Sequence, residues 1–147
     1  MNLPTNQTSQ QVPADYFGIR IPFLEFLGVV PEYAKNGRSR MRIDLRPELE
    51  NSFHVAHGGL LMTLLDVAMA AAARSSLSDP SGEAVMHHSG AITIDMTVSF
   101  MRPSSGTIVV EGSVLKSGKS INYCEAVILN EAGEVTAKSS GTFMLRR

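Results

Sequence analysis

The sequence predicts an α+β fold in which an antiparallel β-sheet curls around one long, apolar helix. Two observations support this prediction. The fourteen residues from Leu60 to Ala73 (LLMTLLDVAMAAAA) are apolar on nearly every side, which is typical of a helix buried in a globular core. Around this stretch, several segments alternate between apolar and polar residues with the period of two that a half-buried strand requires.

Composition limits the class of protein. The chain has 147 residues, of which 44% are hydrophobic and 18% charged, enough for one sizeable core but not two. We therefore predict a flexible polar tail at residues 1–13 and a single domain at residues 14–147. The net charge of −1 provides no basic field for binding nucleic acid.

The same reasoning addresses the cellular compartment. The N-terminus lacks a basic stretch followed by an apolar one, so we predict no signal peptide. The single cysteine, Cys124, cannot form an intramolecular disulfide, and we expect it to be a small buried side chain. The apolar stretch is shorter than the roughly 20 residues that cross a bilayer. We expect a soluble, cytoplasmic protein that does not associate with membranes.

The elements that precede the long helix follow from local signals. Residues 21–28 are predicted to form a short helix that Pro22 opens and Gly28 closes. From Gly37 onward the alternation predicts a strand that ends at Pro47. Apolar residues on one face of this strand alternate with a charged, solvated face to which we assign Arg38, Arg40, Arg42 and Arg46.

The long helix itself is expected from about Gly58 to about Ser76, followed by a loop over residues 76–83. Residues 92–101 then show the clearest strand alternation, and further strands are expected at residues 107–115, 120–129 and 134–145. The connections between the last strands are short, which predicts antiparallel pairing. A sheet of five or six strands around one helix is the hotdog fold. The strand at 92–101 should present to the helix Ile92, Ile94, Met96, Val98 and Phe100.

Asp66 is a carboxylate within an apolar helix. Burial of an ionised carboxylate is costly unless the group is paired or hydrogen-bonded. Asp66 therefore either satisfies polar groups along a seam or faces a cleft and takes part in chemistry.

The residues that lead into the helix bear on this choice. His57-Gly58-Gly59 stands at its start, where first-turn N–H groups lack internal partners and can hold an oxygen that gains negative charge. The glycines alone are equally compatible with a tight turn. Gly58 and Asp66 are about 12 Å apart along the helix axis, so one carbonyl could contact both only if a second copy of the chain supplied one of them. A catalytic interpretation thus predicts a dimer with shared active sites.

Asn51, His57-Gly58-Gly59 and Asp66 resemble the N-x5-HGG-x6-D pattern of PaaI-like hotdog-fold acyl-CoA thioesterases, and the similarity extends from about Phe23 to the end of the chain. The resemblance implies that Asp66 is the nucleophile or the general base. It implies that the Gly58 N–H polarises the thioester carbonyl and that Thr93 lies near the reacting centre. His57 and Asn51 would shape the loop and position the thioester or the water. It implies no metal or cofactor. Simple alternation, however, would turn Thr93 away from the helix unless a bulge or the dimer partner intervenes.

A CoA substrate carries phosphates, so basic groups and free N–H groups should line its site. An ordinary solvated surface explains the same residues equally well. The candidates for substrate binding are Gly59, Arg102, Lys116, Gly118 and Lys119.

Two other hypotheses remain open. A hotdog hydratase or dehydratase would use an Asp–His pair, which His57 and Asp66 could form only across a dimer. A non-catalytic module would bind acyl-CoA without turnover. His87-His88 lacks companions for a metal site and is expected to be a solvated loop pair. The catalytic interpretation predicts a homodimer with shared active sites, and we expect two such dimers to form a homotetramer. The sequence leaves the identity of the acyl group open.

Overall fold

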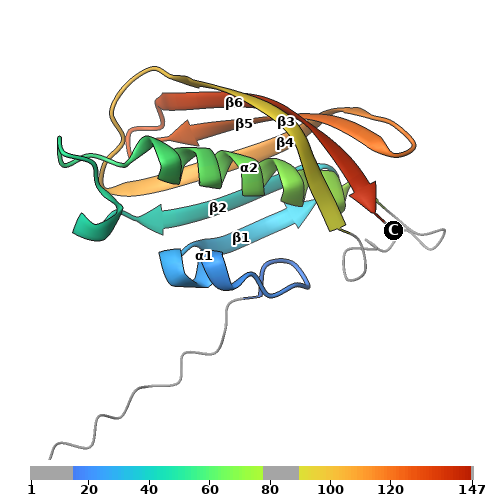
Figure 1. Ribbon diagram of the computed structural model, residues 1–147, viewed down its shortest axis with the longest axis horizontal. Helices are drawn as coiled ribbons and strands as arrows, with labels where there is room; N and C mark the ends of the chain where they lie inside the picture. Colours follow the sequence, from blue (N-terminus) through green and yellow to red (C-terminus); the bar gives the residue numbers. More distant parts are fainter. Residues whose placement is uncertain (1–14, 78–89, 147) are drawn as a thin grey trace, which may run out of the picture.

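The computed structural model describes residues 15–77 and 90–146. One long helix lies along the concave side of a six-stranded sheet (Figure 1). The chain order is α1 (Pro22–Leu27), β1 (Val30–Lys35), β2 (Arg38–Asp44), the 3₁₀ turn η1 (Pro47–Leu49), α2 (Gly58–Ser75), β3 (Gly90–Phe100), β4 (Thr107–Ser117), β5 (Ile121–Leu129) and β6 (Val135–Arg146). The predicted hotdog fold is confirmed.

The strand order across the sheet is β1-β2-β4-β5-β6-β3, and neighbouring strands are antiparallel. β3 follows α2 in the chain but pairs only with the last strand, β6, so it forms one edge of the sheet. Among the described strands this eleven-residue strand has no neighbour on its outer side, so the N–H and C=O groups that point outward can pair with another strand. Our sequence analysis did not predict β1, the strand at the opposite edge of the sheet.

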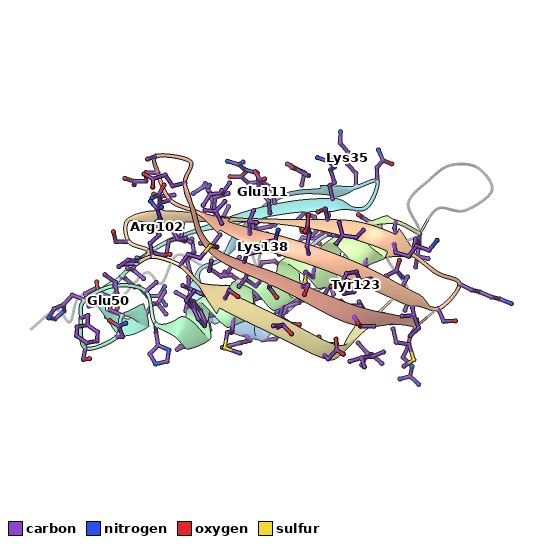
Figure 2. All side chains as sticks on the ribbon, turned by 90° about the horizontal axis from the view of Figure 1, so that it is seen from above. Lys35, Glu50, Arg102, Glu111, Tyr123 and Lys138 are labelled. Carbon is purple, nitrogen blue, oxygen red and sulfur yellow. The ribbon has the colours of Figure 1, made fainter. Side chains whose placement is uncertain are left out.

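The core lies between α2 and the sheet. Leu64, Leu65, Ala68 and Met69 of α2 are fully buried, as are inward side chains of β4 and β5 such as Ile108 and Ile128. Figure 2, turned by 90° from Figure 1, shows the strands in front of α2, with charged residues such as Glu111 and Lys138 on this side of the sheet. Among the described residues, α2 is the one helix with the length and hydropathy to cross a membrane, and 61% of that stretch is buried inside the fold. Burial of this kind also marks the core helix of a globular domain.

The helix approaches the sheet closely at Gly112 of β4. A Cβ placed on Gly112 would lie 2.6 Å from the carbonyl carbon of Ala68. Beside it, the buried Ser39 hydroxyl donates to the Ala68 carbonyl oxygen at 2.6 Å. Glycine is required here because any side chain would push α2 away from the strand. The contact fixes α2 two residues beyond Asp66.

The arginines assigned to one strand face divide into two groups. Arg38, Arg40 and Arg42 do share the outer face of β2, where Arg40 contacts both Glu32 and Glu111. The prediction was wrong for Arg46, which follows β2. Its guanidinium donates to the carbonyl oxygens of Phe26 and Leu27 at the end of α1, so it caps a helix.

Candidate active site

The carboxylate of Asp66 and the hydroxyl of Thr93 are in direct contact. Asp66 lies in the middle of α2 and is half-buried, and Thr93 lies on the adjoining edge strand β3. The Thr93 hydroxyl donates to Asp66 Oδ1 at 2.6 Å. A hydrogen bond to the ionised form stabilises a carboxylate and fixes its orientation. The two residues form a polar pair on an otherwise apolar wall.

A β-bulge aims Thr93 at the helix. The register of β3 against β6 passes from Thr93 opposite Phe143 to Asp95 opposite Thr142, which leaves Ile94 as an extra residue. A bulge of this kind reverses the alternation of side chains. The prediction that Ile92 and Ile94 face the helix was therefore wrong: they are 40% and 54% exposed. Beyond the bulge, Met96 and Val98 pack against the core as expected.

The start of α2 is built by His57. Its side chain caps the helix by accepting the Gly59 N–H on Nδ1 at 2.9 Å. A Cβ on Gly59 would lie 3.0 Å from the same nitrogen, so glycine makes room for the capping ring. The Gly59 N–H is thus engaged within the turn. Gly58 is the first residue of the helix, where the backbone N–H has no partner within the helix and points along the positive end of the helix dipole.

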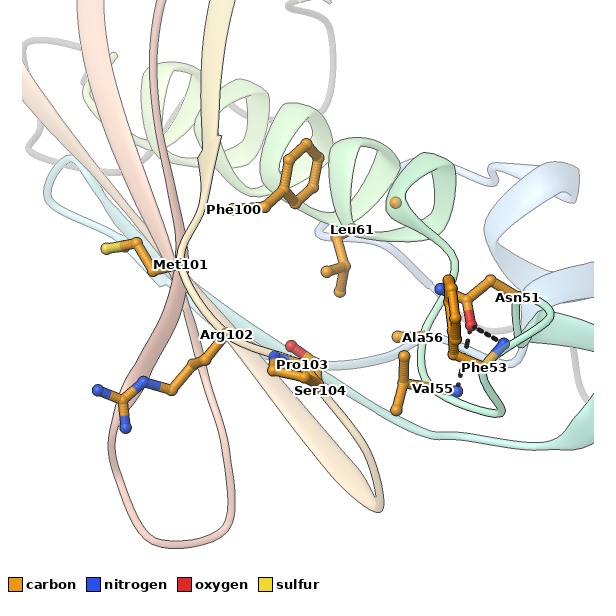
Figure 3. A pocket seen from close by; sticks show the side chains of 11 residues that line it. Asn51, Phe53, Val55, Ala56, Leu61, Phe100, Met101, Arg102, Pro103 and Ser104 are labelled. Carbon is orange, nitrogen blue, oxygen red and sulfur yellow. Dashed lines mark hydrogen bonds between the residues drawn. The ribbon is translucent and has the colours of Figure 1, made fainter.

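Asn51 organises the loop that precedes α2. Its side-chain oxygen accepts the N–H groups of Phe53 at 2.9 Å and Val55 at 3.4 Å (Figure 3). His54, between them, adopts a left-handed φ of 59°, a conformation that non-glycine residues adopt at a cost. Asn51 therefore shapes the turn and does not contact Asp66.

Gly58 and Asp66 belong to two different pockets of the same chain. A pocket of about 610 Å³ adjoins Gly58 and is lined mainly by apolar side chains such as Phe53, Leu61 and Phe100 (Figure 3). A second pocket of about 250 Å³ contains Asp66 and Thr93. The chain brings Asp66 and Thr93 together and leaves Gly58 about two helical turns away.

The predicted substrate-binding residues are dispersed. Arg102 lies at the rim of the Gly58 pocket, pairs with Glu134 and extends its guanidinium away from Leu61 in Figure 3. Lys116, Gly118 and Lys119 lie around the β4–β5 turn, at the end of β4 remote from Thr107 and hence from Arg102. The expectation of a free N–H at Gly118 was wrong, because that group donates to the Ile121 carbonyl at 2.8 Å and closes the turn.

Two further observations concern metals and thiols. Within residues 15–77 and 90–146, no group of three or more His, Cys, Asp or Glu side chains is arranged to hold a metal ion; His87 and His88 lie outside these ranges. Cys124 is fully buried, and burial raises the pKa of its thiol to about 11 because the thiolate is poorly solvated there. It is a core side chain, as predicted.

Our sequence analysis missed the wall of the Asp66 pocket. Side chains from the segment 16–24 line one side of it, and Arg74, two helical turns along α2 from Asp66, lines it as well; the segment contributes Tyr16, Phe17, Ile19, Ile21 and Leu24. Arg74 is 4% exposed and donates to the carbonyl oxygens of Tyr16 and Phe17, and burial lowers the pKa of its guanidinium. Arg74 was the available sequence signal. A cation at the end of an alanine-rich, buried helix requires nearby acceptors, which predicts that another segment packs against it.

Known proteins resemble this chain in sequence and in fold. The model of the family described as "Thioesterase superfamily" matches residues 53–137. A Halobacterium salinarum protein named "Putative esterase" is 34% identical over 118 residues, covering 78% of this chain and 74% of the relative. The solved structure of conserved protein PA5202 from Pseudomonas aeruginosa has a TM-score of 0.77 and 27% identity, covering 91% of this chain and all of that one. The Escherichia coli PaaI protein shares the fold, with a TM-score of 0.74 at 21% identity over 86% of each chain.

Proposed function

The chain belongs to the thioesterase superfamily, and from this we propose that it hydrolyses acyl-CoA thioesters to a carboxylic acid and CoA. Thioester hydrolysis is the activity the family relationship supports in general. The acyl-CoA substrate and the assignment of residues are our proposal. The observation that carries it is the hydrogen-bonded pair of Asp66 and Thr93 at an apolar pocket. The pair lies on a helix that begins at Gly58, whose N–H has no partner within the helix and can face a developing oxyanion.

The proposed chemistry requires no cofactor. As a general base, Asp66 removes a proton from water while the water oxygen bonds to the carbonyl carbon. The C–S bond then breaks, and the proton passes to the leaving CoA thiolate. As a nucleophile, Asp66 would instead form a mixed anhydride that water hydrolyses. In both routes the Thr93 hydroxyl orients the carboxylate and the Gly58 N–H stabilises the oxyanion.

We propose that the active unit is a homodimer. Asp66 and the Gly58 of its own chain are too far apart to contact one carbonyl, so the Gly58 N–H would come from a second copy. The exposed edge of β3 supports this arrangement, as do the apolar side chains along it, where Ile94 and Phe100 are 54% and 52% exposed. Antiparallel pairing of β3 with its copy would also bring the β4–β5 turn of one protomer toward the Arg102 end of the other. Lys116, Lys119 and Arg102 could then hold the phosphates of one CoA.

We further propose that two dimers form a tetramer through the outer face of the sheet. Ile121 and Met144 are directly opposed on β5 and β6, and both are exposed, as is the neighbouring Tyr123 (Figure 2). Exposed apolar side chains grouped in this way favour association.

Thiol release from acyl-CoAs by the wild-type protein and by Asp66→Asn and Thr93→Val tests the proposal. Asp66→Asn should lower kcat by at least about 100-fold, because the amide cannot accept the proton. Thr93→Val should lower it less, and Thr93→Ser should restore much of the rate. The matched control is Asp95→Asn, an exposed carboxylate on the same strand.

Three outcomes would contradict the proposal. Equal losses in Asp66→Asn and Asp95→Asn would point to a general effect on the protein. Full activity in Asp66→Asn would remove this carboxylate from the mechanism. Binding of acyl-CoA by the wild-type protein with no thiol release would favour an acyl-CoA-sensing module.

A further inference from the structure

The pocket that contains Asp66 continues beyond the carboxylate as an apolar trough. Along α2 it follows Asp66, Ala70 and Arg74, which lie four residues apart and therefore on one face of the helix. The trough thus spans about 12 Å from Asp66 to Arg74. Arg74 is buried at its far end.

Small residues create the space. Ala70 and Ala71 line the trough from α2, and Gly90 and Ala91 line it from β3. Larger side chains on either element would fill it, whereas the core side of the same helix carries leucines and Met69. The cavity therefore exists because these four positions carry small side chains or none.

The opposite wall is anchored in place. Phe17, Ile19 and Ile21 contribute apolar surface. The Tyr16 hydroxyl donates to the Val29 carbonyl at 2.9 Å, and Arg74 donates to the Phe17 carbonyl at 3.1 Å. The Arg74 bond holds the wall against α2, and the Tyr16 bond ties it to the segment between α1 and β1. The trough is therefore formed before a ligand arrives, as is usual for small-molecule sites.

We propose that this trough holds the acyl group of the substrate and restricts the enzyme to medium-chain and arylacetyl thioesters, with Ala70 setting the size limit. This inference rests on the function proposed above, because the thioester carbonyl must lie at Asp66. The trough has a volume of about 250 Å³. At about 30 Å³ for each water-sized group, it accepts about eight non-hydrogen atoms beyond the carbonyl. An octanoyl or phenylacetyl group fits within this limit, and a dodecanoyl chain exceeds it. The buried guanidinium of Arg74 at the far end also opposes a longer apolar chain.

The test compares kcat/KM for butanoyl-, octanoyl-, phenylacetyl- and dodecanoyl-CoA in the wild-type protein and two variants. Ala70→Leu adds bulk inside the trough and should lower the octanoyl value at least about tenfold while changing the butanoyl value less than about twofold. Phe17→Ala removes part of the wall and should raise the dodecanoyl value relative to the octanoyl value. The control Phe26→Ala removes a ring that is 77% exposed on α1 and does not line the trough, so it should leave the profile unchanged.

A second measurement separates the inference from the proposed function. Affinities of the same acyl-CoAs for Asp66→Asn, with and without Ala70→Leu, require no turnover. If affinity depends on acyl length and Ala70→Leu lowers the longest acyl group that binds well, the trough is supported even if the wild-type protein hydrolyses nothing. Absence of hydrolysis would then overturn only the proposed function. Wild-type hydrolysis with a profile that Ala70→Leu leaves unchanged, or a wild-type preference for dodecanoyl-CoA, would overturn the inference alone.

Discussion

Cys124 illustrates how strongly the core of this small domain isolates one side chain. The thiol is fully buried on β5, and burial raises its pKa to about 11. In the unfolded chain the thiol has its ordinary, lower pKa, so between about pH 9 and 11 the unfolded state releases a proton that the folded state keeps. The stabilisation is complete below this range and is lost as the pH rises through it, with a slope of at most about 1.4 kcal/mol per pH unit for one proton.

Urea unfolding at several pH values tests this point. The free energy of unfolding of the wild-type protein should fall between pH 9 and 11, and Cys124→Ala should show a shallower fall over that range. Parallel curves for the two proteins would show that other groups cause the dependence.

The sequence pattern predicted some of the individual site residues and missed others. Asp66 was recognisable because burial of a carboxylate in an apolar helix costs free energy unless the group is paired or hydrogen-bonded. Alternation alone did not predict the contact between Thr93 and Asp66, since the contact depends on a bulge at Ile94 that no composition signal marks. The family resemblance did imply that Thr93 lies near the reacting centre. The part played by residues 16–24 was hidden because apolar residues in a short segment look like ordinary core.

At the level of helices and strands, the packing of α2 on β4 depends on the absence of a side chain at Gly112. Gly112→Ala would place a methyl group against the backbone of Ala68 and disturb the hydrogen bond from Ser39. We expect a loss of stability of about 1–3 kcal/mol or more, since overpacking displaces backbone. Gly90→Ala is the control, because a Cβ there meets nothing within 4 Å. Chemical denaturation measures both, and equal stabilities would contradict the close approach.

The elements also show where sequence reasoning succeeds. α2 and the strands after it were predicted within a few residues, because their hydrophobic periods are long and regular. β1 was not identified, although Asn36-Gly37 is a strong hairpin signal. Both residues have positive φ, 51° and 76°, and they join β1 to β2 as a two-residue turn. The strand itself contains Pro31 and little alternation in burial, since an edge strand need not bury one face.

For the molecule as a whole, the central prediction is that each active site is shared between two chains. Gly58→Pro should remove the proposed oxyanion N–H and keep the helix, because proline is accepted at the first helical position. The φ and ψ of His57, −62° and 136°, suit a residue before proline. Gly58→Ala keeps the N–H, and its Cβ would lie 3.6 Å from the Phe100 ring, an ordinary contact. We expect Gly58→Pro to lose at least about 100-fold in kcat and Gly58→Ala to lose little.

Mixing the two inactive chains distinguishes shared sites from sites within one chain. When Asp66→Asn and Gly58→Pro are unfolded together and refolded in equal amounts, half of the dimers should be mixed. Each mixed dimer would hold one site with both groups intact, so about a quarter of the wild-type activity should return. Activity that stays at the level of the separate variants would contradict a shared site, and sedimentation of the wild type as a monomer would contradict the dimer.

The close contact at Gly112 bears on which substitutions can alter the substrate range of the protein without moving Asp66. Because the Gly112 backbone and the Ser39 hydroxyl fix α2 against the sheet two residues beyond Asp66, we expect Asp66 to keep its position when residues of the opposite pocket wall are replaced. The wall at residues 16–24, by contrast, precedes the segment that matches the family model. Selection or engineering could therefore reshape the wall, and with it the range of thioesters accepted, while the carboxylate keeps its place.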